Sequence, residues 1–115
     1  MQYLLLIYAN EAEMAGRTAA AIASMTAEYT EFTKGIIQAG HFKAADRLRP
    51  TSAATTVRVR NGHTEATSGP FVKTGDQLVG FYVIEAKDLD EAVKYAAKCP
   101  VASVGAMEVR PIVQM

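Results

Sequence analysis

Two histidines, His41 and His63, are the side chains of this sequence that titrate near neutral pH. His41 follows Gly40 at the corner between a predicted helix and a predicted strand, where it could act as a general base. The alternative is that it interacts with the last carbonyls of the helix and with the helix dipole. Asp46 lies five residues further along, so a His41–Asp46 catalytic pair requires a bulge, because an unbroken strand turns them to opposite faces. His63 follows a hairpin turn and is predicted to be solvated.

A second set of side chains could hold an anionic group such as a carboxylate, because arginine makes bidentate bonds to it and lysine supplies a compact charge. The predicted ligand-binding residues are Arg47, Lys73, Thr74, Asp76, Tyr82 and Arg110. Their convergence depends on the fold. The alternative places Glu108 and Arg110 in cross-strand charge pairs, Lys73 in solvent, and Asp76 and Tyr82 in loop capping and core packing.

The sequence predicts no metal site and no cofactor. Asp88, Asp90 and Glu91 form a carboxylate cluster, but a helix N-terminus favours such residues without any cation. The two histidines have no metal-ligand spacing, and the glycines match neither a dinucleotide nor a phosphate-loop pattern. The single cysteine, Cys99, excludes an internal disulfide and is predicted to be structural.

Length and charge limit the class of protein. The chain has 115 residues, of which half are hydrophobic, and this predicts a single domain spanning residues 1–115. Lys and Arg total 12, as do Asp and Glu, so the net charge is zero. That balance disfavours nucleic acid and an anionic membrane as partners. The apolar run Tyr3–Tyr8 is too short to cross a bilayer and lacks the flanks of a signal peptide, so we expect a cytoplasmic protein.

The first half of the chain predicts a strand, a long helix and a second strand. Tyr3–Tyr8 is typical of a strand in the middle of a sheet. Apolar residues of 12–39 recur at helical spacing and predict one buried face, with the polar residues facing water. The face comprises Ile22, Met25, Tyr29, Phe32 and Ile36; the water-facing residues include Glu28, Glu31, Lys34 and Gln38. His41–Asp46 then predicts a short strand, and Pro50 disfavours helix at Arg49 in the loop that follows.

The second half predicts a hairpin, a strand, a helix and a last strand. Asn61-Gly62 between residues 55–60 and 63–67 is a strong hairpin signal. Val57 and Val59 share one face of this ribbon and the arginines the other, so one side is expected to face water. Leu78–Glu85 predicts a core strand, with Gly80 marking a bulge or a close backbone approach. Asp88 has the spacing of a helix cap, and the helix presents an apolar face of Leu89, Ala92, Val93 and Ala96; residues 105–110 form the last strand.

This order predicts an α+β fold of the ferredoxin-like βαβ-hairpin-βαβ type, in which one antiparallel sheet carries both helices on one face. Nothing remains in the chain to cover the other face, which includes Val79, Phe81 and Val83 or their alternates. A second copy of the sheet is the expected cover, and it gives a homodimer.

The stretch Ser68-Gly-Pro-Phe-Val-Lys-Thr-Gly-Asp76 resembles the Asp-Gly-Pro-Phe-Ala-Glu-Thr-Lys-Glu signature of the DGPF group of YCII-related proteins. Gly69, Pro70, Phe71 and Thr74 match, whereas Ser68, Val72, Lys73 and Gly75 do not. The resemblance extends over nearly the whole chain and implies a dimeric α/β barrel. It names no reaction, since most members have none assigned, although some are encoded beside alternative sigma factors. Some relatives carry a histidine in the first helix that is thought to act with an aspartate, and residues 12–39 contain none here.

Three hypotheses for function follow. The first is cofactor-free acid/base catalysis on a small anionic metabolite, with His41 as base and Arg47 or Lys73 stabilising the negative charge that develops. The second is a binding module that holds a ligand without turnover, because the altered signature reverses one charge and deletes another. The third, suggested by the resemblance alone, is an interaction partner of a sigma-factor transcription system.

Overall fold

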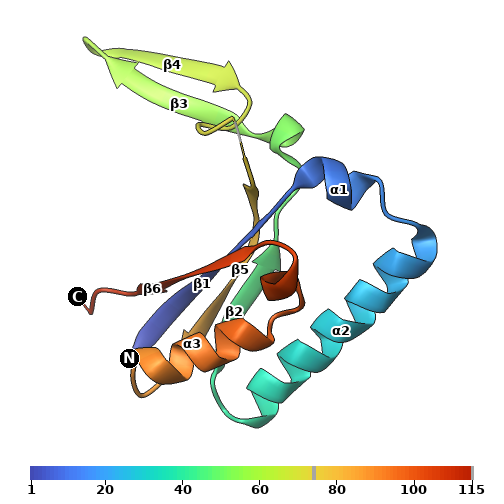
Figure 1. Ribbon diagram of the computed structural model, residues 1–115. Helices are drawn as coiled ribbons and strands as arrows, with labels where there is room; N and C mark the ends of the chain where they lie inside the picture. Colours follow the sequence, from blue (N-terminus) through green and yellow to red (C-terminus); the bar gives the residue numbers. More distant parts are fainter. Residues whose placement is uncertain (74, 115) are drawn as a thin grey trace.

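The computed structural model describes residues 1–73 and 75–114 of the chain (Figure 1). Four strands form the main sheet in the spatial order β2-β5-β1-β6, and every neighbouring pair is antiparallel. These strands are β1 (Gln2–Ala9), β2 (Phe42–Arg47), β5 (Gln77–Glu85) and β6 (Ala106–Pro111). A separate two-stranded sheet consists of β3 (Thr55–Arg60) and β4 (His63–Ser68). The helices are α1 (Glu11–Ala15), α2 (Ala19–Gln38) and α3 (Leu89–Lys98), with short 3-10 turns η1 (Thr51–Ala53) and η2 (Pro100–Ser103).

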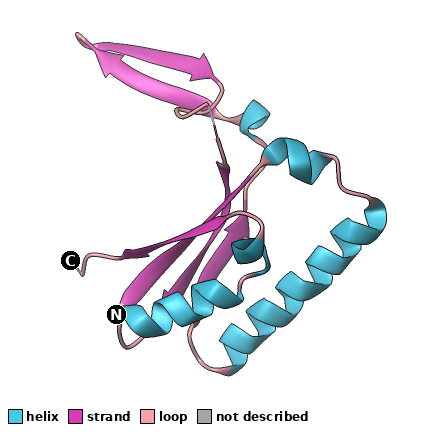
Figure 2. Ribbon diagram, in the orientation of Figure 1, coloured by secondary structure: helices cyan, strands magenta, loops and turns pink. Residues whose placement is uncertain are grey.

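The predicted α+β class and ferredoxin-like topology are confirmed. The two crossovers, β1 to β2 through α2 and β5 to β6 through α3, interleave so that β1 and β5 occupy the centre of the sheet. Helices α2 and α3 lie on one face of the sheet, as the secondary-structure colouring of Figure 2 makes clear.

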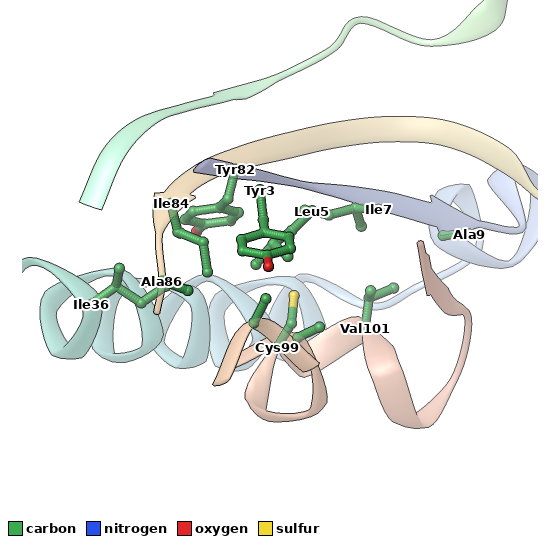
Figure 3. Close-up of a cluster of buried hydrophobic side chains, with 12 residues drawn as sticks. Tyr3, Leu5, Ile7, Ala9, Ile36, Tyr82, Ile84, Ala86, Cys99 and Val101 are labelled. Atoms are coloured by element: carbon green, nitrogen blue, oxygen red, sulfur yellow. The ribbon is translucent and has the colours of Figure 1, made fainter. Parts of the chain in front are cut away.

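The core lies between the sheet and the helices. Along β1 every second residue is buried, beginning with Tyr3 and ending with Ala9, and these side chains point toward the helices (Figure 3). Leu5, Ile36 and Ile84 are fully buried there, and each such side chain stabilises the fold by about 1.5–3 kcal/mol through removal from water. The alternate residues of β1 are only partly buried, so the opposite face of the sheet is open.

The long predicted helix is divided in two. Gly16 ends α1, and Thr18 begins α2 by accepting a hydrogen bond from the Ala21 N–H at 3.1 Å. The prediction of one continuous buried face was wrong for the first half of α2, because Ile22 is 51% exposed. Only the C-terminal half, through Ile36 and its half-buried neighbours Tyr29 and Phe32, packs on the core. Figure 1 shows the first half of α2 extending away from the sheet.

Helix α3 begins as predicted but buries less of its apolar face than expected. Asp88 accepts a hydrogen bond from the Glu91 N–H at 2.9 Å, which caps the helix. Ala92 and Ala96 are buried, whereas Leu89 and Val93 are about half exposed. The small alanines let the helix approach the sheet closely, and the larger side chains remain at its rim.

The predicted hairpin forms, with Asn61 at φ 52° and Gly62 at φ 78°, the positive values that a tight hairpin turn requires. One side was predicted to face water, and in the structure both sides of the ribbon are exposed. Val57 and Val59 are 60% and 59% exposed, since the ribbon does not join the main sheet. In Figure 1 it stands away from the helices and the four-stranded sheet.

Gly80 was predicted to mark a bulge or a close backbone approach, and the structure shows both. The register of β5 against β1 shifts at this point, where Ile7 pairs with Gly80 and Tyr8 with Leu78. A Cβ at Gly80 would lie 3.1 Å from the carbonyl oxygen of Asp46, so the neighbouring strand approaches closely. The shift turns Val79 toward the core, whereas Phe81 lies on the open face as predicted.

Candidate functional site

A groove lies between helix α2 and the edge strand β2, with a volume of about 660 Å³. This volume falls within the range of small-molecule sites. The polar residues that line it are Thr26, Tyr29, Thr30, Thr33, Lys34, Gln38 and Arg47, and Ile37 is apolar. All of these residues except Arg47 belong to α2, where spacings of three and four residues place them on one side of the helix.

Arg47 reaches this groove because of its place in the sheet. It is the last residue of β2 and pairs with Gly80, and two residues earlier Ala45 pairs with Tyr82. Tyr82 points toward the helices, so Arg47 lies on the same face.

The charges at this groove have one sign. Lys34 from α2 and Arg47 from β2 contribute one cation to each wall. Among the described residues, no carboxylate lines the groove. An arginine and a lysine on opposite walls favour a small anion, because the guanidinium can make two parallel hydrogen bonds and the ammonium adds a point charge.

Behind the groove, Tyr82 is connected to the lining residue Thr33. Their hydroxyl oxygens are 2.5 Å apart, and the Tyr82 ring packs edge-on against Phe32 with centroids 5.2 Å apart. Burial raises the pKa of Tyr82, so the phenol is neutral at physiological pH and can donate a hydrogen bond. The predicted ligand-binding residues Arg47 and Tyr82 are therefore brought to the same region, one in the groove and the other behind its wall.

Tyr29 connects the groove to the only cysteine of the chain. The Cys99 thiol donates to the Tyr29 hydroxyl oxygen with an S–O distance of 3.7 Å. Burial is the main cause that raises the pKa of both groups. A thiol held in its neutral form is a poor nucleophile, and Figure 3 shows Cys99 directed into the core, in agreement with the predicted structural role.

A second groove, of about 960 Å³, lies between α2 and α3. Glu28 and Glu31 from α2 and Lys98 from α3 line it, together with Tyr95 and Cys99. Its charges are mixed, so it offers no comparable preference for an anion.

His41 lies at the junction of α2, β2, β5 and α3, and it is not among the residues that line either groove. Its Nδ1 is 2.6 Å from the carbonyl oxygen of Glu85, and its ring centroid is 5.0 Å from that of Tyr95. A carbonyl can only accept, so Nδ1 carries the proton and Nε2 is the basic nitrogen. The carboxylate of Glu91 lies 3.9 Å from Nδ1.

The structure does not bring His41 and Asp46 together. The bulge that such a pair requires is present as a register shift between Phe42 and Ala44. Asp46 nevertheless pairs with Phe81 on the open face, four residues along β5 from Glu85, which is roughly 13 Å. The ring of His41 meanwhile packs against α3.

The other predicted ligand residues are dispersed. Lys73 and Asp76 are exposed in the loop between β4 and β5, and Thr74 lies outside the described residues. Arg110 is on β6, at the opposite edge of the sheet from β2, where its Nε donates to Glu108 Oε2 at 2.7 Å. The alternative predicted cross-strand charge pairs for Glu108 and Arg110, whereas the two residues pair with each other within one strand. Arg47, Lys73 and Arg110 do not form a common site.

Lys34 and Thr33 were not predicted as site residues from the sequence. A signal was present, since Thr26, Thr30 and Thr33 follow one another at helical spacing beside the lysine. Lys34 was assigned to the water-facing side, because hydrophobic periodicity alone does not show where an edge strand will lie.

Within residues 1–73 and 75–114, no group of three or more His, Cys, Asp or Glu side chains is placed to hold a metal ion. In the same part of the chain, no helix has the length and apolarity needed to cross a membrane.

Comparison with known proteins gives two matches. The family model described as the YCII-related domain matches residues 1–115. An uncharacterized protein of Rhizobium meliloti (strain 1021) is 34% identical over 114 residues, which covers 97% of this chain and 92% of the relative.

Proposed function

The chain belongs to the YCII-related family, and from that premise we propose that it binds a small anionic metabolite in the groove between α2 and β2. The observation that carries this proposal is the placement of Lys34 and Arg47 on opposite walls of the groove. Long side chains on two separate elements can close on one anion from both sides.

The hydroxyl groups of the groove narrow the class of ligand. Thr26 donates to the carbonyl of Ile22 and Thr30 donates to the carbonyl of Thr26, each at 2.9 Å. With their protons committed, these oxygens can only accept further hydrogen bonds. A ligand that combines a carboxylate for the two cations with a hydroxyl or amino donor for the threonines satisfies both features, and the Tyr29 ring and Ile37 offer apolar contact to its carbon atoms.

The test is a thermal-shift and calorimetric screen of small hydroxy and amino carboxylates. A ligand at 100 times its dissociation constant adds about 2.7 kcal/mol of stability, a visible shift for a domain of this size. Arg47→Ala and Lys34→Ala are each expected to weaken binding by about 10-fold to 100-fold, the range for losing a hydrogen bond to a charged group. Lys94→Ala, an exposed lysine on α3, is the matched control and is expected to bind as the wild type.

Two results count against the proposal. One is a wild type that no carboxylate of the panel stabilises. The other is binding that survives both Arg47→Ala and Lys34→Ala while the fold, checked by circular dichroism, is retained.

A second candidate is cofactor-free acid/base catalysis with His41 as the base. The observation in its favour is the hydrogen bond from Nδ1 to the Glu85 carbonyl, which fixes the ring and leaves Nε2 as the proton acceptor. Its substrate would lie at the junction beside Tyr95, outside the α2–β2 groove. His41→Gln should abolish turnover without changing anion affinity in the groove, so turnover that persists in this variant contradicts the hypothesis.

We also propose that two copies pair through the open face of the main sheet. Leu4, Leu6, Phe81 and Val83 are adjacent on that face and only partly buried. Burying such a patch is the usual route to an isologous dimer. Sedimentation of the wild type at micromolar concentration tests the pairing, and a monomer contradicts it. The third hypothesis, a partner in a sigma-factor system, predicts another chain that co-purifies with the protein in the absence of any ligand.

A further inference from the structure

We infer that the β3–β4 ribbon (residues 55–68) is an arm that packs its valine face against a second copy of this chain. The contact is additional to the sheet pairing proposed above. It goes beyond the binding function, because none of the ribbon lines the α2–β2 groove.

The ribbon has an apolar face without a cover. Val57 pairs with Ala66 and Val59 with Thr64, so the four side chains share one face. The two valines are each about 60% exposed. The opposite face has a polar pattern that is suited to solvent, in which Arg58 pairs with Glu65 and Arg60 with His63. The arginine face is therefore suited to solvent, and the valine face is suited to contact with a protein surface.

An isolated two-stranded ribbon is marginally stable in water, so this one needs an additional surface to pack on. Within the part of the chain that the structure describes, the ribbon forms a sheet of its own. Figure 1 shows it projecting beyond the end of the main sheet, away from α2 and α3. The surface that covers its valines is consequently not supplied by residues 1–73 and 75–114 of its own chain.

The stem of the ribbon is held in a defined direction. Glu11 of α1 accepts from the Thr51 N–H at 2.9 Å and also from the Thr51 hydroxyl, which anchors η1 immediately before β3. At the base, the Gly69 N–H donates to Ala54 at 2.8 Å and the Thr56 hydroxyl donates to Gly69 at 2.9 Å. A ribbon fixed at its stem and free along its length is preorganised for docking, because little further ordering is required on contact.

The shape of the molecule suits another copy as the occupant. Its radius of gyration is 16.0 Å, whereas a compact chain of this length has about 13 Å. The principal extents of 48 × 43 × 18 Å describe a flat body with a projecting part. A second copy related by a two-fold axis would supply both arms with a surface at once and would cover the open sheet as well.

Nucleic acid is the main rival occupant, because Arg58 and Arg60 lie along one face of a ribbon. The net charge of zero opposes it. A nucleic acid bound to the arginine face would also leave Val57 and Val59 in water. The exposed valine face is the part of the ribbon that needs a cover, and the protein surface of a second copy would supply it.

Sedimentation velocity over a concentration series tests the arm directly. Val57→Glu/Val59→Glu is expected to weaken dimerisation on the order of 100-fold, since two apolar side chains would leave a buried contact. Arg60→Glu/Thr67→Glu is the matched control, because it places two carboxylates on the opposite face of the same ribbon. The control is expected to stay within a few-fold of the wild type, and circular dichroism shows whether each variant is folded.

A photo-cross-linking residue in place of Val59 provides a second measurement that does not depend on a destabilising change. In a dimer assembled from ¹⁴N-labelled and ¹⁵N-labelled chains, cross-linked peptides are expected to include mixed ¹⁴N–¹⁵N pairs. Cross-links confined to single chains would overturn the proposal.

The remaining outcomes separate the arm from the sheet pairing. A wild type that is monomeric overturns both. A dimer unaffected by the valine substitutions overturns the arm and leaves the sheet pairing standing. Equal weakening by both variants overturns the assignment to the valine face. Retardation of duplex DNA that Arg60→Glu/Thr67→Glu abolishes, together with a monomeric wild type, identifies nucleic acid as the occupant instead.

Discussion

Replacing Gly105 with alanine should destabilise the protein strongly, although it adds only one methyl group. A Cβ at this position would lie 2.3 Å from the carbonyl oxygen of Tyr8 and 3.1 Å from Cγ2 of Val101. The first obstacle is backbone of the central strand β1, which cannot rotate away as a side chain could. Either β1 or the start of β6 must shift, and the N–H of Gly105, which donates to the Val101 carbonyl at 2.7 Å, moves with it.

The magnitude follows from the cost of overpacking. An extra methylene in a packed core costs about 1–3 kcal/mol, and a contact with backbone at this distance belongs at the upper end. We therefore expect Gly105→Ala to lower the free energy of unfolding by about 3 kcal/mol, a fall in Tm on the order of 10 °C. Urea denaturation followed by circular dichroism, with thermal melts in parallel, measures both quantities.

Gly35→Ala is the matched control. Gly35 is inside helix α2, and apart from the adjoining backbone of that helix no heavy atom of the described residues lies within 4 Å of where its Cβ would be. Alanine is the better helix former, so this variant should gain roughly 0.5–1 kcal/mol. The same chemical change is thus expected to have opposite signs at the two positions. A Gly105→Ala protein as stable as the wild type would refute the packing of β6 against β1 described above.

Three further predictions follow from local contacts. Asp88→Ala removes the cap of α3 and should lower the free energy of unfolding by about 1 kcal/mol in urea titrations, whereas no loss would contradict the cap. Cys99 should react slowly with iodoacetamide at pH 8 in the native protein and fast in urea, because burial shields the thiol and raises its pKa; equal rates in mass spectrometry would contradict this. Hydrogen bonds lower the pKa of three carboxylates, Glu11, Glu85 and Glu108, below 4.5 in the folded chain. The unfolded chain therefore binds more protons near that pH than the folded chain does. Their stabilisation is complete above pH 4.5 and is lost as the pH falls through the folded pKa values, and the triple Gln variant should flatten the acid limb of a stability–pH curve.

Local sequence signals predicted the fold well where a single residue type decides the backbone. Asn61-Gly62 located the hairpin because few other pairs accept two positive φ angles. Asp88 located the start of α3 because its side chain satisfies an N–H that the helix leaves free. The continuous apolar run Tyr3–Tyr8 likewise predicted a strand in the middle of the sheet, and the order of the elements then led to the topology.

Packing was predicted less well, because it depends on where whole elements cross. The stripe from Ile22 to Ile36 has helical spacing throughout, yet only the part beyond about Tyr29 meets the core. Periodicity shows which side of a helix is apolar, but not how far the helix runs past its sheet. The ribbon presents the same limit, since alternation in β3 gave an apolar face and could not say that the face lacks a partner within the chain.

The candidate site shows most clearly what a sequence pattern leaves undetermined. Phe42 and Arg47 are five residues apart, so an unbroken strand would turn them to opposite faces of the sheet. The register shift between Phe42 and Ala44 inserts one residue and restores them to the same, helix-covered face. The bulge thereby directs Arg47 toward Lys34 and leaves Asp46 on the open face. The sequence pattern shows Arg47 and Lys34 as two unrelated cations. One extra residue in the edge strand β2 places both of them at the same groove.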